Sequence, residues 1–221
     1  MKRHIVFDLD GTLVDSLPGI AEGVNRALRA LGRQPHTQKA ISRMIGSGAA
    51  NLCAQALGYE DAAHTPPAEM ESMHEQFRAH YPQCWQPPYT RAYPWIANML
   101  TLLSAEGAQL AVLSNKPHDV TEPMVRALFP HIPFTFIMGY TGQYPRKPAP
   151  DSLQYMADSW GIPLSEITLV GDSLFDARTT QNAGCGLALV AWGYAEVSDL
   201  VAWSAPVFGS VDELRHYLLN T

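Results

Sequence analysis

Short apolar runs rich in β-branched residues alternate with helical patterns along most of this 221-residue chain. The apolar runs lie at 5–7, 110–113, 167–170 and 187–191, and helical periodicity lies at 95–106, 118–129, 151–160 and 174–183. Continuous apolar runs are typical of strands buried on both faces, and their alternation with helices is typical of a parallel sheet. The sequence therefore predicts an α/β fold with a Rossmann-like parallel-sheet core.

The stretch between the first two apolar runs has a different pattern, because it contains helical segments and no strand-like run. One helical face carries Ile20, Val24, Leu28 and Leu31 and ends at Gly32. Further helices are expected at 37–45, 49–57 and 67–80, and a segment dense in proline and aromatic residues follows at 82–94. We therefore expect a core domain of residues 1–15 and 88–221, with an inserted helical cap domain at 16–87.

The net charge and the cysteine content restrict the classes of binding partner and the cellular compartment that are expected. The net charge is −6, which disfavours nucleic acid and anionic membrane surfaces as partners. The three cysteines, Cys53, Cys84 and Cys185, are far apart and odd in number, which favours reduced thiols over a disulfide framework. The N-terminal apolar run is too short for a signal peptide, and no run approaches the length of a membrane span. We expect a cytoplasmic protein whose oligomeric state is open.

Acidic and anion-binding residues follow three of the predicted strands. In an open α/β sheet, ligands bind beyond the carboxyl ends of the strands. The first strand is followed by Asp8, Asp10, Gly11 and Thr12, the second by Ser114 and Asn115, and the third by Asp172 and Asp176; Lys147 precedes a helix between them. These residues are expected to meet at one edge of the sheet.

Four carboxylates in one pocket repel one another unless a cation is present. Such a set of hard oxygen ligands suits Mg²⁺, which shares its coordination sphere with water and substrate oxygens. A phosphoryl group would supply those oxygens, and Lys147, hydroxyls and backbone N–H groups would meet its charge. One carboxylate could then act as a nucleophile and a second as a general acid and base.

Two features of these segments have another interpretation, the acidic loop at Asp8 and the choice of the phosphate-binding lysine. A calcium loop of the EF-hand type counted from Asp8 would need Gly at the sixth position and Glu at the twelfth, where Leu13 and Gly19 stand. Lys116 is a rival to Lys147 as the phosphate-binding cation, although a lysine at that point is also expected to hold a local carbonyl or to lie at the pocket rim.

Four segments in this order, DLDGTLVDS, LSNKP, RKPAPD and VGDSLFDARTTQNAG, resemble the four motifs of the haloacid dehalogenase-like hydrolase superfamily. The inserted helices resemble the small helical cap of that superfamily. Within it, the segments DSLPGI, IGSGAANL, SNKP and WGY resemble the phosphoglycolate phosphatases.

The resemblance implies a role for each core residue. Asp8 would be the nucleophile that forms an aspartyl phosphate, and Asp10 the general acid and base whose carbonyl binds Mg²⁺. Lys147 would neutralise the phosphoryl group, while Asp172 completes the metal site and Asp176 orients Lys147 or a metal-bound water. Phosphate contacts would come from Gly11, Thr12, Ser114, Asn115 and Lys147, with Thr12 also bonded to Asp10.

The substrate would be a small phosphorylated metabolite, with 2-phosphoglycolate as the first choice. In the cap, Arg43 could pair with a substrate carboxylate, or it could be a solvated arginine; Gly46 and Gly48 could form a loop over the substrate, or simply a turn. The alternatives are a β-phosphoglucomutase-type isomerase, a phosphatase for sugar phosphates, nucleotides or pyrophosphate, and a binding protein that has lost the chemistry.

Overall fold

The computed structural model describes residues 1–220, which form two compact units. One unit comprises Met1–Val14 and Ala92–Thr221, of which Thr221 lies outside the described residues, and the other comprises Asp15–Arg91. We call the first the core unit and the second the helical unit. Each is described below by itself.

The core unit is built on a six-stranded parallel sheet with the strand order β5-β4-β1-β6-β7-β8. The strands are β1 (His4–Phe7), β4 (Gln109–Pro117), β5 (Phe134–Tyr140), β6 (Ile167–Gly171), β7 (Gly186–Val190) and β8 (Val207–Phe208). The parallel α/β core predicted from the sequence is confirmed.

Strand β1 occupies the centre of this sheet because it is apolar on both faces. Val6 lies between Ala111 of β4 and Leu169 of β6, and all three side chains are fully buried. The prediction missed two strands. Most residues of β5 are half-exposed at the edge of the sheet, and β8 has two residues, so neither gives the continuous apolar run of a central strand.

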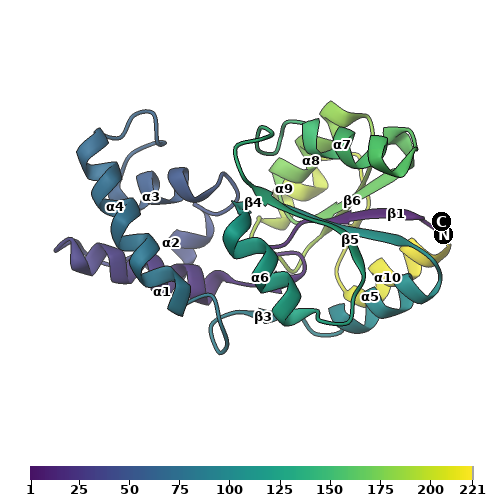
Figure 1. Ribbon diagram of the computed structural model, residues 1–221, viewed down its shortest axis with the longest axis horizontal. Helices are drawn as coiled ribbons and strands as arrows, with labels where there is room; N and C mark the ends of the chain where they lie inside the picture. Colours follow the sequence, from purple (N-terminus) through teal and green to yellow (C-terminus); the bar gives the residue numbers. More distant parts are fainter. Residues whose placement is uncertain (221) are drawn as a thin grey trace. The chain divides into compact units, whose positions relative to one another are not determined.

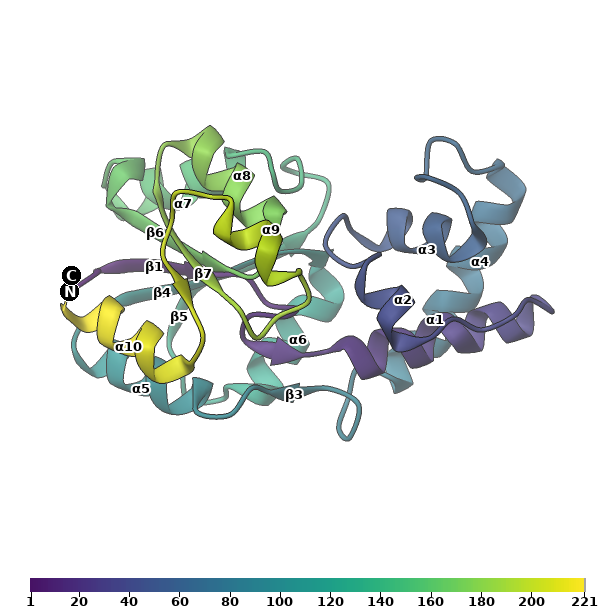
Figure 2. The ribbon, with the colours of Figure 1, turned by 180° about the vertical axis from the view of Figure 1, so that it is seen from behind.

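Helices cover both faces of the sheet. In Figures 1 and 2, α7 and α8 lie on one face, and α5, α6 and α10 lie on the other. The helices of the core unit are α5 (Ile96–Ala105), α6 (His118–Leu128), α7 (Asp151–Trp160), α8 (Leu174–Ala183), α9 (Val197–Val201) and α10 (Val211–Asn220), with a 3₁₀ turn, η2, at Leu164–Glu166. Expected and observed bounds agree within a residue or two for α5 to α8.

The helical unit contains α1 (Leu17–Ala30), α2 (Gln38–Ser42), α3 (Ala49–Leu57), α4 (Pro67–His80) and the 3₁₀ turn η1 (Tyr81–Gln83). Val24 and Leu28 of α1, and Met73 and Phe77 of α4, are among its buried side chains. Gly23 permits close packing of α1, because a Cβ at this position would lie 2.8 Å from the Tyr81 ring.

The chain passes between the units at two short strands, β2 (Val14–Asp15) and β3 (Arg91–Ala92), which pair with each other. No helix among residues 1–220 combines the length and the apolar character needed to cross a bilayer.

Candidate active site

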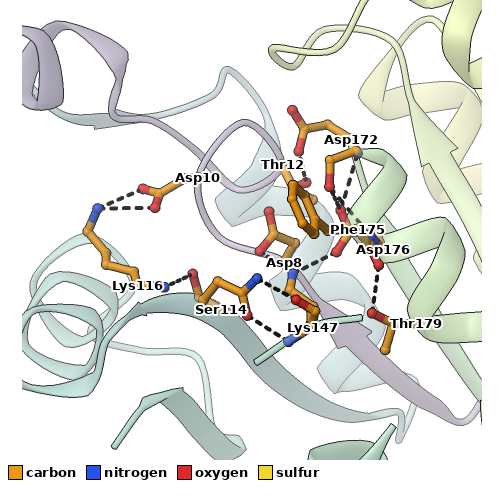
Figure 3. Close-up of polar contacts among 12 residues, drawn as sticks. Asp8, Asp10, Thr12, Ser114, Lys116, Lys147, Asp172, Phe175, Asp176 and Thr179 are labelled. Atoms are coloured by element: carbon orange, nitrogen blue, oxygen red, sulfur yellow. Dashed lines mark hydrogen bonds and ion pairs between the residues drawn. The ribbon is translucent and has the colours of Figure 1, made fainter. Parts of the chain in front are cut away.

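The polar residues at the carboxyl ends of β1, β4 and β6 meet at one edge of the sheet (Figure 3). Because these three strands are neighbours and parallel, the segments after them emerge side by side. Asp8 follows β1, Ser114 to Lys116 are the last residues of β4 before Pro117, and Asp172 follows β6. This is the arrangement expected from the sequence.

Lys147 joins two of the carboxylates. Its Nζ lies 2.6 Å from Oδ1 of Asp8 and 2.6 Å from Oδ1 of Asp176, and all three side chains are buried. Asp8, Asp172 and Asp176 each place a carboxylate oxygen within 4.8 Å of the others. The four residues, which we call the acid cluster, carry three negative charges and one positive charge.

The backbone of Lys147 is held by Asn115. The Asn115 side chain donates from Nδ2 to the Lys147 carbonyl at 2.9 Å and accepts from the Lys147 N–H at 2.8 Å. Two buried hydrogen bonds therefore fix the residue that carries the ammonium. The sequence predicted that Asn115 lies beside the phosphate site, but gave no signal for this contact between residues 32 positions apart.

Asp172 is held by a backbone N–H at one oxygen and by a side-chain hydroxyl at the other. Its Oδ2 accepts from the Tyr194 N–H at 2.7 Å, and its Oδ1 accepts from Thr12 Oγ1 at 3.4 Å. A Cβ on Gly193 would lie 2.2 Å from the Asp172 Cβ, and a Cβ on Gly11 would lie 2.3 Å from its Oδ2. Only glycine permits these close approaches. The Thr12 hydroxyl thus contacts Asp172, a partner that the sequence did not predict for it.

The loop after β1 is closed by its own backbone bonds. The Gly11 N–H donates to the Val14 carbonyl at 2.9 Å, with Gly11 at φ +90°, and the Thr12 N–H donates to the Leu9 carbonyl at 3.3 Å. The indole Nε1 of Trp192 donates to the Thr12 carbonyl at 3.1 Å. Trp192 thus stabilises this loop through a side-chain hydrogen bond.

Asp176 lies in the first turn of α8, which begins after the N-cap residue Ser173. Ser173 Oγ donates to Oδ2 of Asp176 at 2.6 Å, and the Asp176 N–H donates back to Ser173 Oγ at 3.4 Å. One oxygen of Asp176 thus serves the helix cap and the other serves Lys147.

Asp10 and Lys116 form a second charged pair, apart from the acid cluster in Figure 3. Lys116 Nζ lies 3.1 Å from both carboxylate oxygens of Asp10, and the two side chains are 6% and 12% exposed. The pocket-rim interpretation of Lys116 is therefore wrong, since its side chain is buried against the expected general acid.

Burial governs the electrostatics of the acid cluster. It raises the pKa of Asp8 to about 7; the Lys147 ammonium opposes this shift, and the Asp176 carboxylate adds to it. Burial, together with Asp8 and Asp176, also raises the pKa of Asp172 well above its usual range. For Lys147, burial alone lowers the pKa, but Asp176 and Asp8 outweigh it and the net pKa is raised. Lys147 is therefore positively charged, whereas Asp8 and Asp172 lack enough nearby positive charge to offset the effect of burial.

These residues fit a hard divalent cation. The excess of negative charge in the acid cluster is two, and its donors are carboxylate oxygens, which Mg²⁺ prefers. Asp176 has both oxygens engaged by Lys147 and Ser173, whereas no hydrogen bond to Asp8 Oδ2 is found within residues 1–220. Both oxygens of Asp172 also accept hydrogen bonds, but from the neutral donors Thr12 and Tyr194 rather than from an ammonium. Asp8 and Asp172 are therefore the better placed ligands, and Asp176 supports Lys147.

Arg43, Gly46 and Gly48 belong to the helical unit. Arg43 follows α2, and the two glycines lie in the turn to α3 with φ angles of +116° and +94°. Such angles favour glycine, and they fit a loop over the substrate as well as a simple turn.

Known proteins were compared with this chain on both sequence and structure. The family model described as "Haloacid dehalogenase-like hydrolase" matches residues 5–190. The chain belongs to this family. Its residues are 32% identical to a phosphoglycolate phosphatase of Rhodospirillum rubrum, over 99% of this chain and 91% of the relative. They are also 32% identical to a phosphoglycolate phosphatase of Pseudomonas fluorescens, over 97% and 78%.

Solved structures agree with this assignment. A crystal structure described as a predicted phosphoglycolate phosphatase from Haemophilus somnus superposes with a TM-score of 0.86 at 28% identity, covering 98% of each chain. This haloacid dehalogenase-like hydrolase is thus an enzyme, a phosphoric monoester hydrolase similar to the phosphoglycolate phosphatases.

Proposed function

We propose that this enzyme hydrolyses a small phosphate monoester in a Mg²⁺-dependent reaction through an aspartyl phosphate on Asp8. The observation that carries this proposal is the pairing of Lys147 with Asp8 at 2.6 Å inside a cluster of three carboxylates. The ammonium fixes the Asp8 carboxylate, which would attack phosphorus through one of its two oxygens.

The reaction has two halves. In the first, Asp8 forms a bond to phosphorus, the ester P–O bond breaks, and Asp10 gives a proton to the departing alkoxide. In the second, water attacks the phosphorus of the aspartyl phosphate, Asp10 takes the proton of that water, and inorganic phosphate and the Asp8 carboxylate are restored. Ser114, at the end of β4, would bind a phosphoryl oxygen beside the Asn115 backbone.

Asp8, Asp172 and the backbone carbonyl of Asp10 would hold Mg²⁺, which when bound polarises the phosphoryl oxygens and offsets the charge of the acid cluster. Gly11 and Thr12 would shape the phosphate site, since both N–H groups donate inside the loop and the Thr12 hydroxyl donates to Asp172. Asp176 would keep Lys147 in place, because their contact is as short as the one between Lys147 and Asp8.

The best single substrate is 2-phosphoglycolate, supported by the relatives at 32% identity. The helical unit would act as the cap domain, excluding bulk water while the aspartyl phosphate exists. Arg43 would meet a substrate carboxylate, with Gly46 and Gly48 forming the loop beside it. We place the enzyme in the cytoplasm, in keeping with its three free cysteines.

Phosphate release from a panel of monoesters, with and without Mg²⁺, tests the proposal. The panel contains 2-phosphoglycolate, sugar phosphates, nucleotides and pyrophosphate. We expect strong preference for 2-phosphoglycolate, and silence in EDTA that added Mg²⁺ reverses. Even release over the panel would withdraw the substrate. Isomerisation of a β-sugar phosphate without net release would assign the enzyme to the mutase class instead.

A further inference from the structure

The buried pair of Lys116 and Asp10 lies on a different side of the site from the acid cluster (Figure 3). Lys116 reaches both Asp10 oxygens at 3.1 Å, so the carboxylate that would protonate the leaving group is bound bidentately by an ammonium. Lys147, in contrast, contacts Asp8 and Asp176 around the expected position of phosphorus. The two lysines thus serve different parts of a bound ester.

The backbone of Lys116 is anchored, whereas its charge lies at the end of a flexible stem. The Lys116 N–H donates to Ser114 Oγ at 3.2 Å, and its carbonyl accepts from Thr121 Oγ1 at 3.3 Å. An ammonium on four methylene groups can move between acceptors without backbone movement. The ion pair with Asp10 can therefore be exchanged for another while β4 stays in place.

The place of Lys116 follows from the role of Asp10. A general acid must lie beside the oxygen that leaves, so a cation bound to Asp10 lies on the leaving-group side of phosphorus. In 2-phosphoglycolate the carbon attached to that oxygen bears a carboxylate. A negative charge on the substrate would thus arrive beside Lys116.

We propose that Lys116 is a specificity-determining residue, which passes from Asp10 to an anionic group on the leaving alcohol of the substrate. Asp10, no longer paired with the ammonium, then takes up a proton from solvent water and gives it to the leaving oxygen. This inference rests on the proposed function. Removing one partner of a buried ion pair without replacement is costly. A carboxylated leaving group supplies the replacement, whereas a neutral one leaves Asp10 bound to Lys116. The enzyme would then distinguish carboxylated from neutral leaving groups in the rate of the chemical step as well as in substrate binding.

The first experiment compares two esters that differ in the carboxylate, 2-phosphoglycolate and ethyl phosphate. The wild-type enzyme is expected to prefer 2-phosphoglycolate. Lys116→Met should lower kcat/KM for 2-phosphoglycolate about 100-fold, in line with the loss of a buried charge pair. Its kcat/KM for ethyl phosphate should fall by a clearly smaller factor, because this ester has no carboxylate for Lys116 to contact and loses only the pairing of Lys116 with Asp10. Equal losses on both esters would show a merely structural role and overturn the proposal.

The second experiment measures binding without turnover. In calorimetric titrations with Mg²⁺ present, wild-type enzyme should bind 3-phosphonopropionate about 100-fold more tightly than propylphosphonate, and Lys116→Met should abolish this preference. Arg178→Met removes an exposed positive charge from α8 and is the matched control, expected to keep the preference. If Arg43→Met abolishes the preference and Lys116→Met retains it, Lys116 does not read the carboxylate.

Thermal melting verifies that each variant is folded, and Lys116→Gln replaces Lys116→Met if the latter does not fold. Failure of the underlying function has a distinct signature, since wild-type enzyme would then hydrolyse neither ester. A wild-type enzyme that hydrolyses both esters equally well would keep the phosphatase assignment and overturn the role of Lys116.

Discussion

In the core unit, charged side chains such as Asp8, Lys147 and Asp172 are buried at the ends of strands, whereas the helical unit keeps its ion pairs at the surface. Arg26 and Glu22 of α1, for example, are about a third exposed, and Arg33 and Glu69 more so. Every buried charged residue within residues 1–220 belongs to the core unit. Burying charge is costly without compensation, so the core unit gives up stability for chemistry while the helical unit does not.

The largest expected effect comes from the nucleophile. Asp8→Asn should lower kcat by about 10⁴-fold or more, because Asp8 is the proposed acceptor of the phosphoryl group. Its metal-free melting temperature should be unchanged or higher, because one charge leaves a crowded cluster. Steady-state phosphate release and calorimetric melting measure the two effects. Residual turnover within tenfold of wild type would remove the covalent mechanism.

A smaller loss of metal affinity is expected from a substitution at Gly193, whose backbone packs closely against Asp172. Gly193→Ala would push its Cβ into Asp172, so the Mg²⁺ concentration for half-maximal activity should rise about 10- to 100-fold. Gly209→Ala is the matched control, since a Cβ there would lie 3.5 Å from Glu213 Oε2, an ordinary contact. Identical Mg²⁺ titrations for both variants would show that the position of Asp172 does not set metal binding.

The buried carboxyl group of Asp8 in the core unit makes the stability of the protein depend on pH. Burial raises the pKa of Asp8 to about 7, above that of an unfolded carboxyl, so its contribution to stability is present in acid and lost as pH rises from about 4 to 7. In EDTA, the melting temperature should fall by a few degrees between pH 5 and pH 8. Added Mg²⁺ should restore more stability at pH 8 than at pH 5, and a shift of equal size at both would contradict the charge excess.

The smallest effect is expected in the helical unit. Arg26→Ala breaks the surface pair with Glu22 and should change the free energy of unfolding by less than about 0.5 kcal/mol. Urea unfolding with Glu22→Ala as the companion variant measures this. A loss of several kcal/mol would mean that surface pairs of the helical unit carry as much energy as the buried pairs of the core.

Sequence patterns predicted which charged residues meet at one edge of the sheet, because these residues stand at the ends of apolar runs or just before a helix. Asp8 directly follows an apolar strand, and Lys147 and Asp172 stand at expected strand or helix ends, so a shared sheet edge brings them together. The contacts that hold them were invisible in the sequence. Asn115 grips the Lys147 backbone and Tyr194 donates to Asp172 through its N–H, and a backbone donor has no residue signature.

Lys116 shows a different limit of sequence analysis. A lysine one position after Asn115 could hold a carbonyl, lie at the rim or pair with an acid, and the choice depends on how the loop after β1 folds. That loop is closed by bonds among Leu9, Gly11 and Val14. In the same way, β5 was missed because an edge strand needs no continuous apolar run, and its assignment depends on its partner β4.

The central position of β1 has a consequence for synthesis on the ribosome. His4 pairs with Gln109 on one side and with Ile167 on the other, so the first strand made must wait for more than a hundred residues before either neighbour exists. The intervening residues 15–91 form a compact unit of their own and are complete earlier. The emerging chain therefore carries a complete helical unit next to an apolar strand that has no partner yet. During this period the unpaired strand is prone to aggregate, and this is when the protein most needs a chaperone.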